Sequence, residues 1–321
     1  MILRVAVVGA GVMGRHHANN YAALPSAHLV ALVDPSESCR VEAEANYGLP
    51  CYASVEALLQ AKKVDAVSIA APTSHHFELA QQLLEAGVHV LVEKPVATDV
   101  TQARNLFALS RRQRRVLQVG HITRFYSAVQ RLQAQVDSPY LIEARRLSPS
   151  ARIRDVGVIL DLMIHDIDII LGLVKGSPKH ITVAGHSLNG DPHEDVAAAQ
   201  IVFDTGCIAR LLASRVAPDA ERTLVVSERH VTHRLDFARD PLSEVKVFKP
   251  LETQGDVHVQ VDVRTIDEGN PLRRELAHFL LCISGDARPV GTPEDDLRSL
   301  SLATELLDRL EPNRRPETLL G

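Results

Sequence analysis

Two hydrophobic periods alternate over the first 120 residues of the chain. Short runs that are apolar throughout are typical of strands buried on both faces, as in a parallel sheet. Such runs lie at Ile2–Val8, His28–Val33, Ala66–Ala70, Val88–Val92 and Val116–Val119. The stretches between them have the helical period, near residues 13–23, 36–46, 54–61, 75–86 and 99–112. Strands that alternate with amphipathic helices predict a doubly wound α/β domain with helices on both faces of its sheet.

The pattern changes after about residue 121. One long apolar helix is predicted near 156–172, and strands of alternating polarity are predicted near 180–187, 195–203, 207–214, 222–227, 231–236 and 243–248. Strands without intervening helices favour a mostly antiparallel sheet that leaves one face open. Two closing helices are expected after Asn270-Pro271 and Thr292-Pro293, because Pro is favoured at the first helical position.

Length and composition limit the architecture and the partners. The 321 residues exceed what one core usually serves, so we place two α/β domains at 1–121 and 122–321 and leave open whether the last helix packs back on the first. The 35 Lys and Arg and 40 Asp and Glu give a net charge of −5, and Trp is absent. Without a basic field or stacking residues, the expected partner is a small molecule and not nucleic acid.

Cysteine spacing and hydropathy limit the location of the protein. The four cysteines form no CxxC pair, which argues against a zinc site or a redox dithiol. Apolar runs are too short to span a membrane, and the chain enters its first strand with no room for a removable leader. A cytoplasmic protein without a membrane partner is expected.

A glycine-rich loop follows the first predicted strand directly and leads into a helix. In Gly9-x-Gly11-x-x-Gly14, the first glycine allows a tight turn, the second lets a pyrophosphate approach, and the third lets helix and strand pack closely. The helix N-terminus would offer N–H groups to the phosphates. Alternatively, the glycines only shape a turn.

Asp34 ends the second predicted strand, 20 residues after Gly14. A carboxylate at this place accepts hydrogen bonds from the adenosine ribose and repels a 2′-phosphate, so NAD is expected in preference to NADP. Arg40 is a cation that could instead receive a 2′-phosphate, and Asp34 could merely cap the helix that begins near Ser36.

The fifth predicted strand ends in Glu93-Lys94-Pro95. Ligands of open α/β sheets bind beyond the carboxyl ends of the strands, so Lys94 should point toward the site. Its ammonium could stabilise charge on a reacting oxygen as it becomes an alkoxide. The alternative is an ion pair between neighbours on the surface.

The apolar helix of the second half carries three ionisable residues, Asp161, His165 and Asp168. Their spacing of i, i+4 and i+7 puts them on one face of an α-helix. An Asp one turn from a His can orient the imidazole, which can then accept a hydroxyl proton near neutral pH. The alternative is a buried Asp–His pair that holds the helix to the sheet.

Two further clusters precede and follow this helix. Arg145, Arg146, Arg152 and Arg154 could clamp a diphosphate, or could be solvated loop charges. His193-Glu194-Asp195 lacks the H-E-x-x-H spacing, so no metal is expected there.

These motifs, together with Ala71-Pro72-Thr73-Ser74-x-His76, occur in the order of one enzyme family. The chain resembles the Gfo/Idh/MocA oxidoreductases over nearly its whole length, and Glu-Lys-Pro with Asp-x-x-x-His is the most specific part. The resemblance implies a Rossmann domain and an α/β domain whose open-faced sheet pairs subunits into homodimers or homotetramers. It also implies NAD(P)-dependent oxidation of a secondary hydroxyl on a sugar, polyol or nucleotide sugar.

The resemblance also implies roles for single residues. Lys94 and His165 become the catalytic pair at the reacting hydroxyl, with Asp161 supporting His165. The implied cofactor site consists of Gly9, Gly11, Val12, Met13, Gly14, Asp34, Ala71, Pro72, Thr73, His76, Glu93 and Lys94. The implied substrate contacts are Lys94, His121, Arg124, Arg152, Arg154, Asp161 and His165. No metal is implied.

Within the family, Gly120-His121-x-x-Arg124-Phe125 and Leu162-Met163-Ile164-His165-Asp166 are similar to the nucleotide-sugar branch. This likeness implies oxidation of C3 of a UDP-N-acetylhexosamine to a 3-keto sugar, which a PLP aminotransferase would use next. Met163 stands where many members carry Gly, and Tyr126 where nucleotide-sugar relatives often have Asn. The alternatives are a free-sugar or inositol-type dehydrogenase, a redox-neutral NAD-dependent glycosidase, and a non-catalytic NAD-binding regulator.

Overall fold

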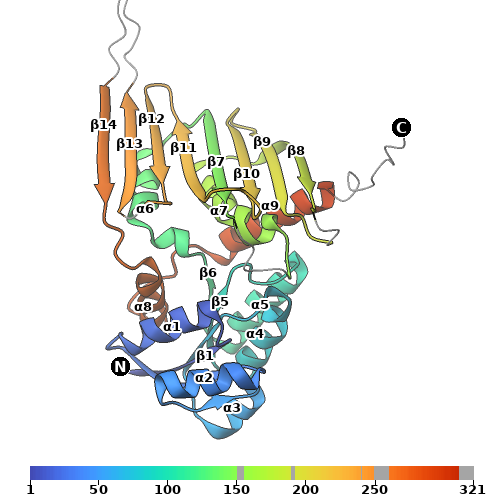
Figure 1. Ribbon diagram of the computed structural model, residues 1–321, viewed down its shortest axis with the longest axis vertical. Helices are drawn as coiled ribbons and strands as arrows, with labels where there is room; N and C mark the ends of the chain where they lie inside the picture. Colours follow the sequence, from blue (N-terminus) through green and yellow to red (C-terminus); the bar gives the residue numbers. More distant parts are fainter. Residues whose placement is uncertain (150–154, 189–191, 240, 249–259, 311–321) are drawn as a thin grey trace, which may run out of the picture. The chain divides into compact units, whose positions relative to one another are not determined.

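A computed structural model of the protein describes residues 1–149, 155–188, 192–239, 241–248 and 260–310 (Figure 1). The chain divides into two compact units, which are described separately. Unit 1 comprises Met1–Phe125 and Asn270–Leu297, and unit 2 comprises Tyr126–Gly269 and the residues from Arg298 onward. The division therefore differs from the expected single cut at 121, because Asn270–Leu297 belongs to unit 1.

The described part of unit 1 contains a sheet of six parallel strands in the order β3-β2-β1-β4-β5-β6. The strands are β1 (Leu3–Val8), β2 (Ala27–Val33), β3 (Cys51–Tyr52), β4 (Ala66–Ile69), β5 (His89–Glu93) and β6 (Leu117–Gly120). The helices are α1 (Val12–Ala22), α2 (Glu37–Tyr47), α3 (Val55–Ala61), η1 (Thr73–His75), α4 (His76–Glu85), α5 (Val100–Gln113), η2 (Ile122–Phe125) and α8 (Pro271–Ser284). The order reverses between β1 and β4, which confirms the predicted Rossmann fold.

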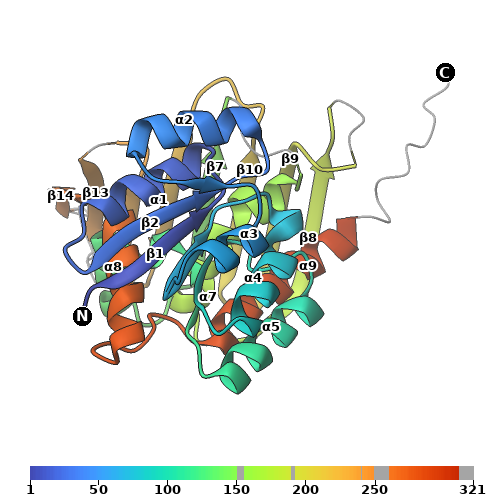
Figure 2. The same ribbon diagram turned by 90° about the horizontal axis from the view of Figure 1, so that it is seen from below.

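Helices cover both faces of this sheet, with α1 and α2 on one side and α4 and α5 on the other (Figure 2). On the α1 side, Val5, Val7 and Leu91 of the strands pack against Ala18 and Tyr21 of α1. The same core includes four apolar residues of α8, namely Leu272, Leu276, Phe279 and Leu280. This shared core is the physical reason why a segment far along the chain belongs to unit 1.

Side-chain caps explain why the helices begin close to the predicted positions. Ser36, Ser54, Asp99 and Asn270 each accept a backbone N–H in the first turn of α2, α3, α5 and α8, respectively. Such a cap contributes about 1 kcal/mol to helix stability. Gly87, which follows α4, has φ of +74° and ends the helix in the left-handed conformation that glycine favours.

The described part of unit 2 contains an eight-stranded sheet in the order β14-β13-β12-β11-β7-β10-β9-β8 (Figure 1). The strands are β7 (Leu141–Leu147), β8 (Pro178–His186), β9 (Val196–Phe203), β10 (Ile208–Ser214), β11 (Glu221–Ser227), β12 (Val231–Asp236), β13 (Leu242–Phe248) and β14 (Gln260–Ile266). The helices are α6 (Ser127–Gln135), the π-helical segment η3 (Ile159–Met163), α7 (Ile164–Leu173) and α9 (Pro293–Leu310), which begins in unit 1. Among these strands, β7 and β10 pair in parallel and the other neighbours pair antiparallel.

The strands of unit 2 alternate between buried and exposed side chains. In β9 and β10, Ile201, Ala209 and Leu211 are buried, whereas Gln200 and Arg210 are exposed. The buried side chains pack toward the helices, and the exposed ones form an open face. The predicted open-faced, mostly antiparallel sheet is thus confirmed.

Candidate active site

The glycine loop of unit 1 connects β1 to α1 with little room for side chains. Gly9 has φ of +94°, and a Cβ there would lie 2.5 Å from the Ala70 carbonyl oxygen. A Cβ at Gly14 would overlap the Gly9 carbonyl. A Cβ at Gly11 would meet no described atom within 4 Å, so the space over this residue is open. The loop therefore fits a pyrophosphate above Gly11, at the N-terminus of α1.

Two side chains of the first turn of α1 face outward beside this loop. Val12 is 47% exposed and Met13 is 37% exposed. Their exposure is compatible with the contact to a cofactor that the sequence implies.

Asp34 follows β2, and backbone N–H groups hold its carboxylate in place. Ala10 N donates to Asp34 Oδ2 at 2.8 Å, and Ser36 N donates to Oδ1 at 2.9 Å. The Arg40 guanidinium donates to the carbonyl oxygens of Asp34 and Pro35 at 3.0 and 2.8 Å. A carboxylate fixed beside the glycine loop has the chemistry to accept the ribose hydroxyls of NAD.

Replacing Asp34 with Ala should raise the KM for NAD by about 10- to 100-fold, because a hydrogen bond to a charged group contributes about 1.5–3 kcal/mol. The preference for NAD over NADP should narrow, since the repulsion of the 2′-phosphate is lost. The ratio of kcat/KM for the two cofactors measures this effect. Adding Arg40→Ala should remove any gain with NADP, and an unchanged ratio in Asp34→Ala would contradict the role of Asp34.

His76 holds two chain segments of unit 1 together. Its Nδ1 lies 2.7 Å from the Pro95 carbonyl oxygen, and its Nε2 lies 2.9 Å from the Ala71 carbonyl oxygen. Carbonyl oxygens only accept hydrogen bonds, so a protonated ring nitrogen donates in such a contact. The buried His76 side chain thus contacts both the segment after β4, with Pro72 and the buried Thr73, and the turn after β5.

Glu93 and Lys94 lie at the carboxyl end of β5, where the Lys94–Pro95 bond is cis. The fully buried His17 of α1 has its Nε2 2.9 Å from Glu93 Oε1. Burial opposes ionisation of Glu93, but the hydrogen bond with His17 and the charges of His17, Lys94 and His76 outweigh it and lower the pKa of Glu93. At the end of β5, the ionised carboxylate of Glu93 is therefore followed in the sequence by the half-buried ammonium of Lys94.

A second acid, Glu275 of α8, is fully buried in unit 1. Neither of its carboxyl oxygens has a hydrogen-bond partner among the described residues. Burial, followed by the negative charge of Glu93, raises the pKa of Glu275 well above its ordinary value, although Arg124 opposes the shift. The raised pKa favours the neutral form of Glu275, whereas the lowered pKa of Glu93 favours its ionised form. The sequence reading missed it, although it lies three residues after Leu272 and four before Phe279, on the apolar face of α8.

Replacing Glu275 with Gln should make the protein more stable at neutral and alkaline pH. The folded state keeps Glu275 protonated above its unfolded pKa of 4.5, so the wild type binds more protons folded than unfolded and loses stability as pH rises from there through the raised folded pKa. Gln remains neutral and removes this loss. Urea unfolding measured from mildly acidic to alkaline pH should give a flatter stability profile for Glu275→Gln, while the exposed Glu78→Gln should follow the wild type. Parallel profiles for all three proteins would contradict the assignment.

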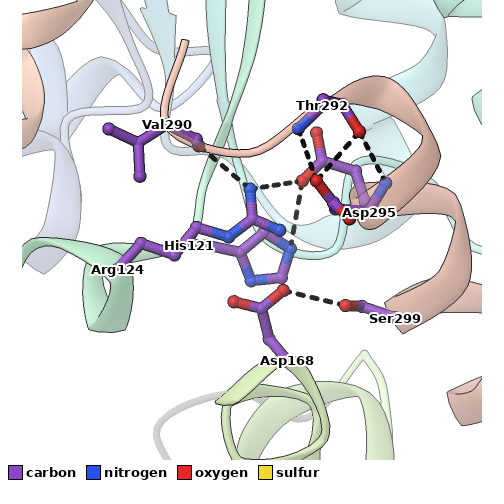
Figure 3. Close-up of polar contacts among 8 residues, drawn as sticks. His121, Arg124, Asp168, Val290, Thr292, Asp295 and Ser299 are labelled. Carbon is purple, nitrogen blue, oxygen red and sulfur yellow. Dashed lines mark hydrogen bonds and ion pairs between the residues drawn. The ribbon is translucent and has the colours of Figure 1, made fainter. Parts of the chain in front are cut away.

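His121 and Arg124 follow β6 and meet the first turn of α9 within unit 1 (Figure 3). Arg124 Nη1 lies 2.8 Å from Asp296 Oδ1 and donates to the Val290 carbonyl oxygen at 3.3 Å. His121 Nε2 lies 3.8 Å from the same Asp296 oxygen. Asp296 thus holds both residues, and their contact with substrate stays a prediction.

In unit 2, Asp161 and His165 lie on consecutive helical segments and are both partly exposed. The expected single α-helix is wrong at its start, because residues 159–163 are π-helical. Asp168, the third residue of the expected common face, differs from these two in its surroundings: it is buried and accepts a hydrogen bond from Ser299 Oγ at 2.8 Å (Figure 3). Single π-helical turns within helices are frequent at functional sites.

The arginines before this helix differ from one another in their surroundings. Arg146, on β7, is buried and forms a two-point ion pair with Asp166, at 3.1 Å from Nε to Oδ2 and 2.7 Å from Nη2 to Oδ1. Burial disfavours its charge, but Asp166, with smaller contributions from Tyr126 and Asp161, raises the pKa of Arg146. Arg145 pairs with Glu221 at 2.9 Å on the exposed side. Arg145 and Arg146 therefore belong to a strand and not to a charged loop, which was the alternative interpretation. Arg152 and Arg154 lie outside the described residues.

The described residues show neither a metal-binding cluster nor a membrane-spanning helix. No group of three or more His, Cys, Asp or Glu residues there could hold a metal ion. Likewise, none of the helices within the described ranges is long and apolar enough to cross a membrane.

A Rossmann sheet with an open pyrophosphate loop and a fixed carboxylate after β2 defines an NAD-binding oxidoreductase. A sequence model described as an oxidoreductase family with an NAD-binding Rossmann fold matches residues 3–121, and one described as the GFO/IDH/MocA C-terminal domain matches 112–246. The chain belongs to the Gfo/Idh/MocA family of NAD-dependent oxidoreductases, which act on CH–OH groups.

Several relatives of the chain carry named activities. UDP-N-acetylglucosamine 3-dehydrogenase of Acidithiobacillus ferrooxidans is 37% identical over 75% of this chain and 76% of its own length. Its solved structure matches with a TM-score of 0.88 and 32% identity, covering 98% of this chain and 100% of that one. D-glucoside 3-dehydrogenase of Escherichia coli is 32% identical over 58% of this chain and 57% of its own length. Inositol 2-dehydrogenase of Pseudomonas fluorescens is 29% identical over 63% and 64%, respectively.

Proposed function

We propose that this enzyme oxidises the C3 hydroxyl of a UDP-N-acetylhexosamine to the 3-keto sugar with NAD as the hydride acceptor. The observation that carries the proposal is the 37% identity to a UDP-N-acetylglucosamine 3-dehydrogenase over 75% of this chain. The chain also contains Lys94, Asp161 and His165, the residues that the proposed chemistry needs. A protein that only bound NAD would have no need of this set.

Lys94 and His165 are the proposed catalytic residues. His165 accepts the proton of the reacting hydroxyl, and Asp161 supports the imidazole in this role. Lys94 donates a hydrogen bond to the same oxygen and stabilises its negative charge as the carbonyl forms. NAD, when bound, supplies the acceptor for the hydride that leaves the carbon. The products are the ketone, NADH and one proton.

The cofactor contacts follow the residues of unit 1. The backbone at Gly11 receives the pyrophosphate, and Asp34 receives the adenosine ribose. Glu93, held ionised by its neighbours, receives the nicotinamide ribose, and Pro72 and Thr73 line the nicotinamide side. His76 contributes by holding this segment, through the Ala71 and Pro95 carbonyls.

The substrate contacts beyond the reacting hydroxyl are proposed for cationic residues. Arg152 and Arg154 receive the diphosphate as bidentate donors. His121 and Arg124 contribute a second polar group, with Asp296 keeping the Arg124 guanidinium in place. A sugar held in this way depends on charge and hydrogen bonds, in keeping with a chain that lacks Trp.

Assembly and location complete the proposal. The open face of the eight-stranded sheet supports a homodimer or homotetramer, because exposed strand faces commonly pack together. A cytoplasmic location is part of the proposal and follows from the sequence alone. The 3-keto product calls for a PLP aminotransferase as the next enzyme.

The decisive experiment incubates the protein with NAD and a panel of UDP-sugars, free sugars and polyols, following NADH formation and the keto product. Turnover of a UDP-N-acetylhexosamine with a product oxidised at C3 supports the proposal. No turnover of any UDP-sugar, together with turnover of a free polyol, would instead indicate the second candidate function, that of a polyol dehydrogenase. The likeness to inositol 2-dehydrogenase favours this candidate next.

A further inference from the structure

The Glu194-Asp195 pair before β9 is an acidic motif of unit 2 that the proposed reaction does not use. Both side chains are buried, with 1% and 3% of their surface exposed. Buried carboxylates are costly unless they are paired or hydrogen-bonded, so their partners indicate what they do. Glu194 contacts the start of the segment that carries Asp161 and His165 directly, and Asp195 is linked to it through Arg215.

Glu194 binds the backbone where this segment begins. Its Oε1 accepts a hydrogen bond from Ile159 N at 2.9 Å, and its own carbonyl oxygen accepts one from Val158 N at 3.1 Å. The carboxyl group occupies the place where a Cβ at Gly157 would be, so a larger residue there would displace the Glu194 carboxylate. Gly157 in turn accepts a hydrogen bond from Asp161 N at 3.0 Å. Glu194 is therefore linked to the backbone of Asp161 through residues 157–159.

Asp195 reinforces the same segment through an arginine. Its Oδ1 lies 2.6 Å from Arg215 Nε, and both side chains are 4% exposed. Arg215 Nη1 then donates to the Val156 carbonyl oxygen at 2.9 Å. Asp195 Oδ2 also accepts a hydrogen bond from Leu188 N at 2.8 Å. Residues 156–159 are thus held by two neighbouring acids at the start of β9.

Because η3 is π-helical, the position of residues 156–159 determines how Asp161 is oriented. A π-helical turn adds one residue relative to an α-helix, and one residue corresponds to about 100° around the helix axis. If residues 156–159 were released and the turn rewound to α-helix, Asp161 would rotate by about this angle relative to His165. Farther along, Asp166 and Asp168 are bound by Arg146 and Ser299, so α7 itself is already fixed.

We propose that Glu194 is a positioning residue for the catalytic segment: it fixes residues 157–159 and with them the orientation of Asp161 toward His165, while the Asp195–Arg215 pair fixes Val156. This inference rests on the proposed roles of Asp161 and His165. It gives Glu194 no contact with substrate or cofactor.

The test compares Glu194→Ala with Glu194→Gln, which retains an acceptor for Ile159 N. Glu194→Ala should lower kcat by about 30- to 100-fold, since a displacement of about 1 Å in a reacting group can cost this much. The KM for NAD should stay unchanged, and the pH profile of kcat should shift, because Asp161 no longer supports His165. Glu194→Gln should restore kcat to within about threefold of the wild type and restore the wild-type pH profile.

Asp204 offers a matched control in the same unit. It accepts a hydrogen bond from Ser177 N at 3.0 Å, and its carboxylate likewise occupies the place of a Cβ at Gly176. Asp204 is exposed, so Asp204→Ala controls for the loss of an acid that binds a backbone N–H beside a glycine away from the catalytic segment, and kcat is compared per folded enzyme. It should leave kcat and its pH profile unchanged. Equal effects of Glu194→Ala and Asp204→Ala on kcat per folded enzyme, or no effect of Glu194→Ala, would overturn the proposal.

Hydrogen exchange separates this inference from the proposed function. Amides of residues 157–165 should lose protection in Glu194→Ala and keep it in Glu194→Gln and Asp204→Ala. Unchanged protection in Glu194→Ala would overturn the inference whatever the activity. If the wild type turned over none of the sugars, the proposed function would be wrong. The exchange measurement would still decide whether Glu194 holds the segment.

Discussion

An enzyme in which Ala replaces His165 should turn over its sugar about 10³-fold more slowly than the wild type and still bind NAD. The removal of a general base costs about 10²- to 10⁴-fold in rate, and the residues that form the NAD site of unit 1 are untouched. Steady-state kcat and NAD binding by isothermal titration calorimetry measure the two parts. The exposed His230, in the turn between β11 and β12, supplies a control, because His230→Ala should behave as the wild type. Near-normal turnover in His165→Ala would contradict the assigned base.

Lys94→Ala extends this test to the other proposed catalytic residue. Loss of one group that stabilises a developing oxyanion costs about 10²- to 10³-fold in kcat. If His165 and Lys94 act on one oxygen, the double variant should lose much less than the product of the two single losses, because residues that act as a unit are not additive. Fully multiplicative losses would separate the two residues into independent functions.

The first half of the fold could be read from hydrophobic periods because each strand there is buried on both faces. β1, β2, β4, β5 and β6 lie within one or two residues of the predicted strands. β3 was missed because it has only two residues, Cys51 and Tyr52, and so shows no period. The helix starts were readable because the chain itself supplies their caps, such as Ser54 and Asp99.

The elements of the second half were harder to predict from the sequence where a strand carries polar or exposed side chains. β7 contains Arg145 and Arg146, which in the sequence resemble a charged loop, yet Arg146 is an inward-facing residue neutralised by Asp166. The edge strand β14 is mostly exposed, so it has little hydrophobic signal. α6 is a short helix, and its assignment depends on packing that no local pattern reveals.

The site divides in the same way. The glycine loop and Asp34 have a fixed spacing that follows from the shape of a dinucleotide, so the sequence was sufficient to predict them as a cofactor site, and the structure brings Asp34 to the loop backbone. The sequence could not predict contacts between residues that are far apart in the chain, such as the contact of His17 with Glu93, 76 positions away. The π-helical turn at Asp161 was missed for the same reason, because its start is bound by Glu194, 35 positions from Ile159.

The strongest test of the cofactor loop contrasts Gly14→Ala with Gly11→Ala. A methyl group at position 14 would overlap the Gly9 carbonyl, and Gly9 is itself fixed by a positive φ and by contact with Ala70. Backbone on both sides has no room to move, so Gly14→Ala should cost about 3 kcal/mol of stability and also abolish measurable NAD binding.

Gly11→Ala should give the opposite combination. Its added methyl meets no atom of the described residues within 4 Å, and its φ of −68° suits any residue, so the Tm without cofactor should equal that of the wild type. The same methyl fills the space proposed for the pyrophosphate, so the Kd for NAD should rise by at least about 100-fold, the loss expected when charge-assisted hydrogen bonds of about 1.5–3 kcal/mol are blocked. Thermal unfolding with and without NAD separates the two variants. A Gly11→Ala protein that NAD stabilises as well as the wild type would place the pyrophosphate elsewhere.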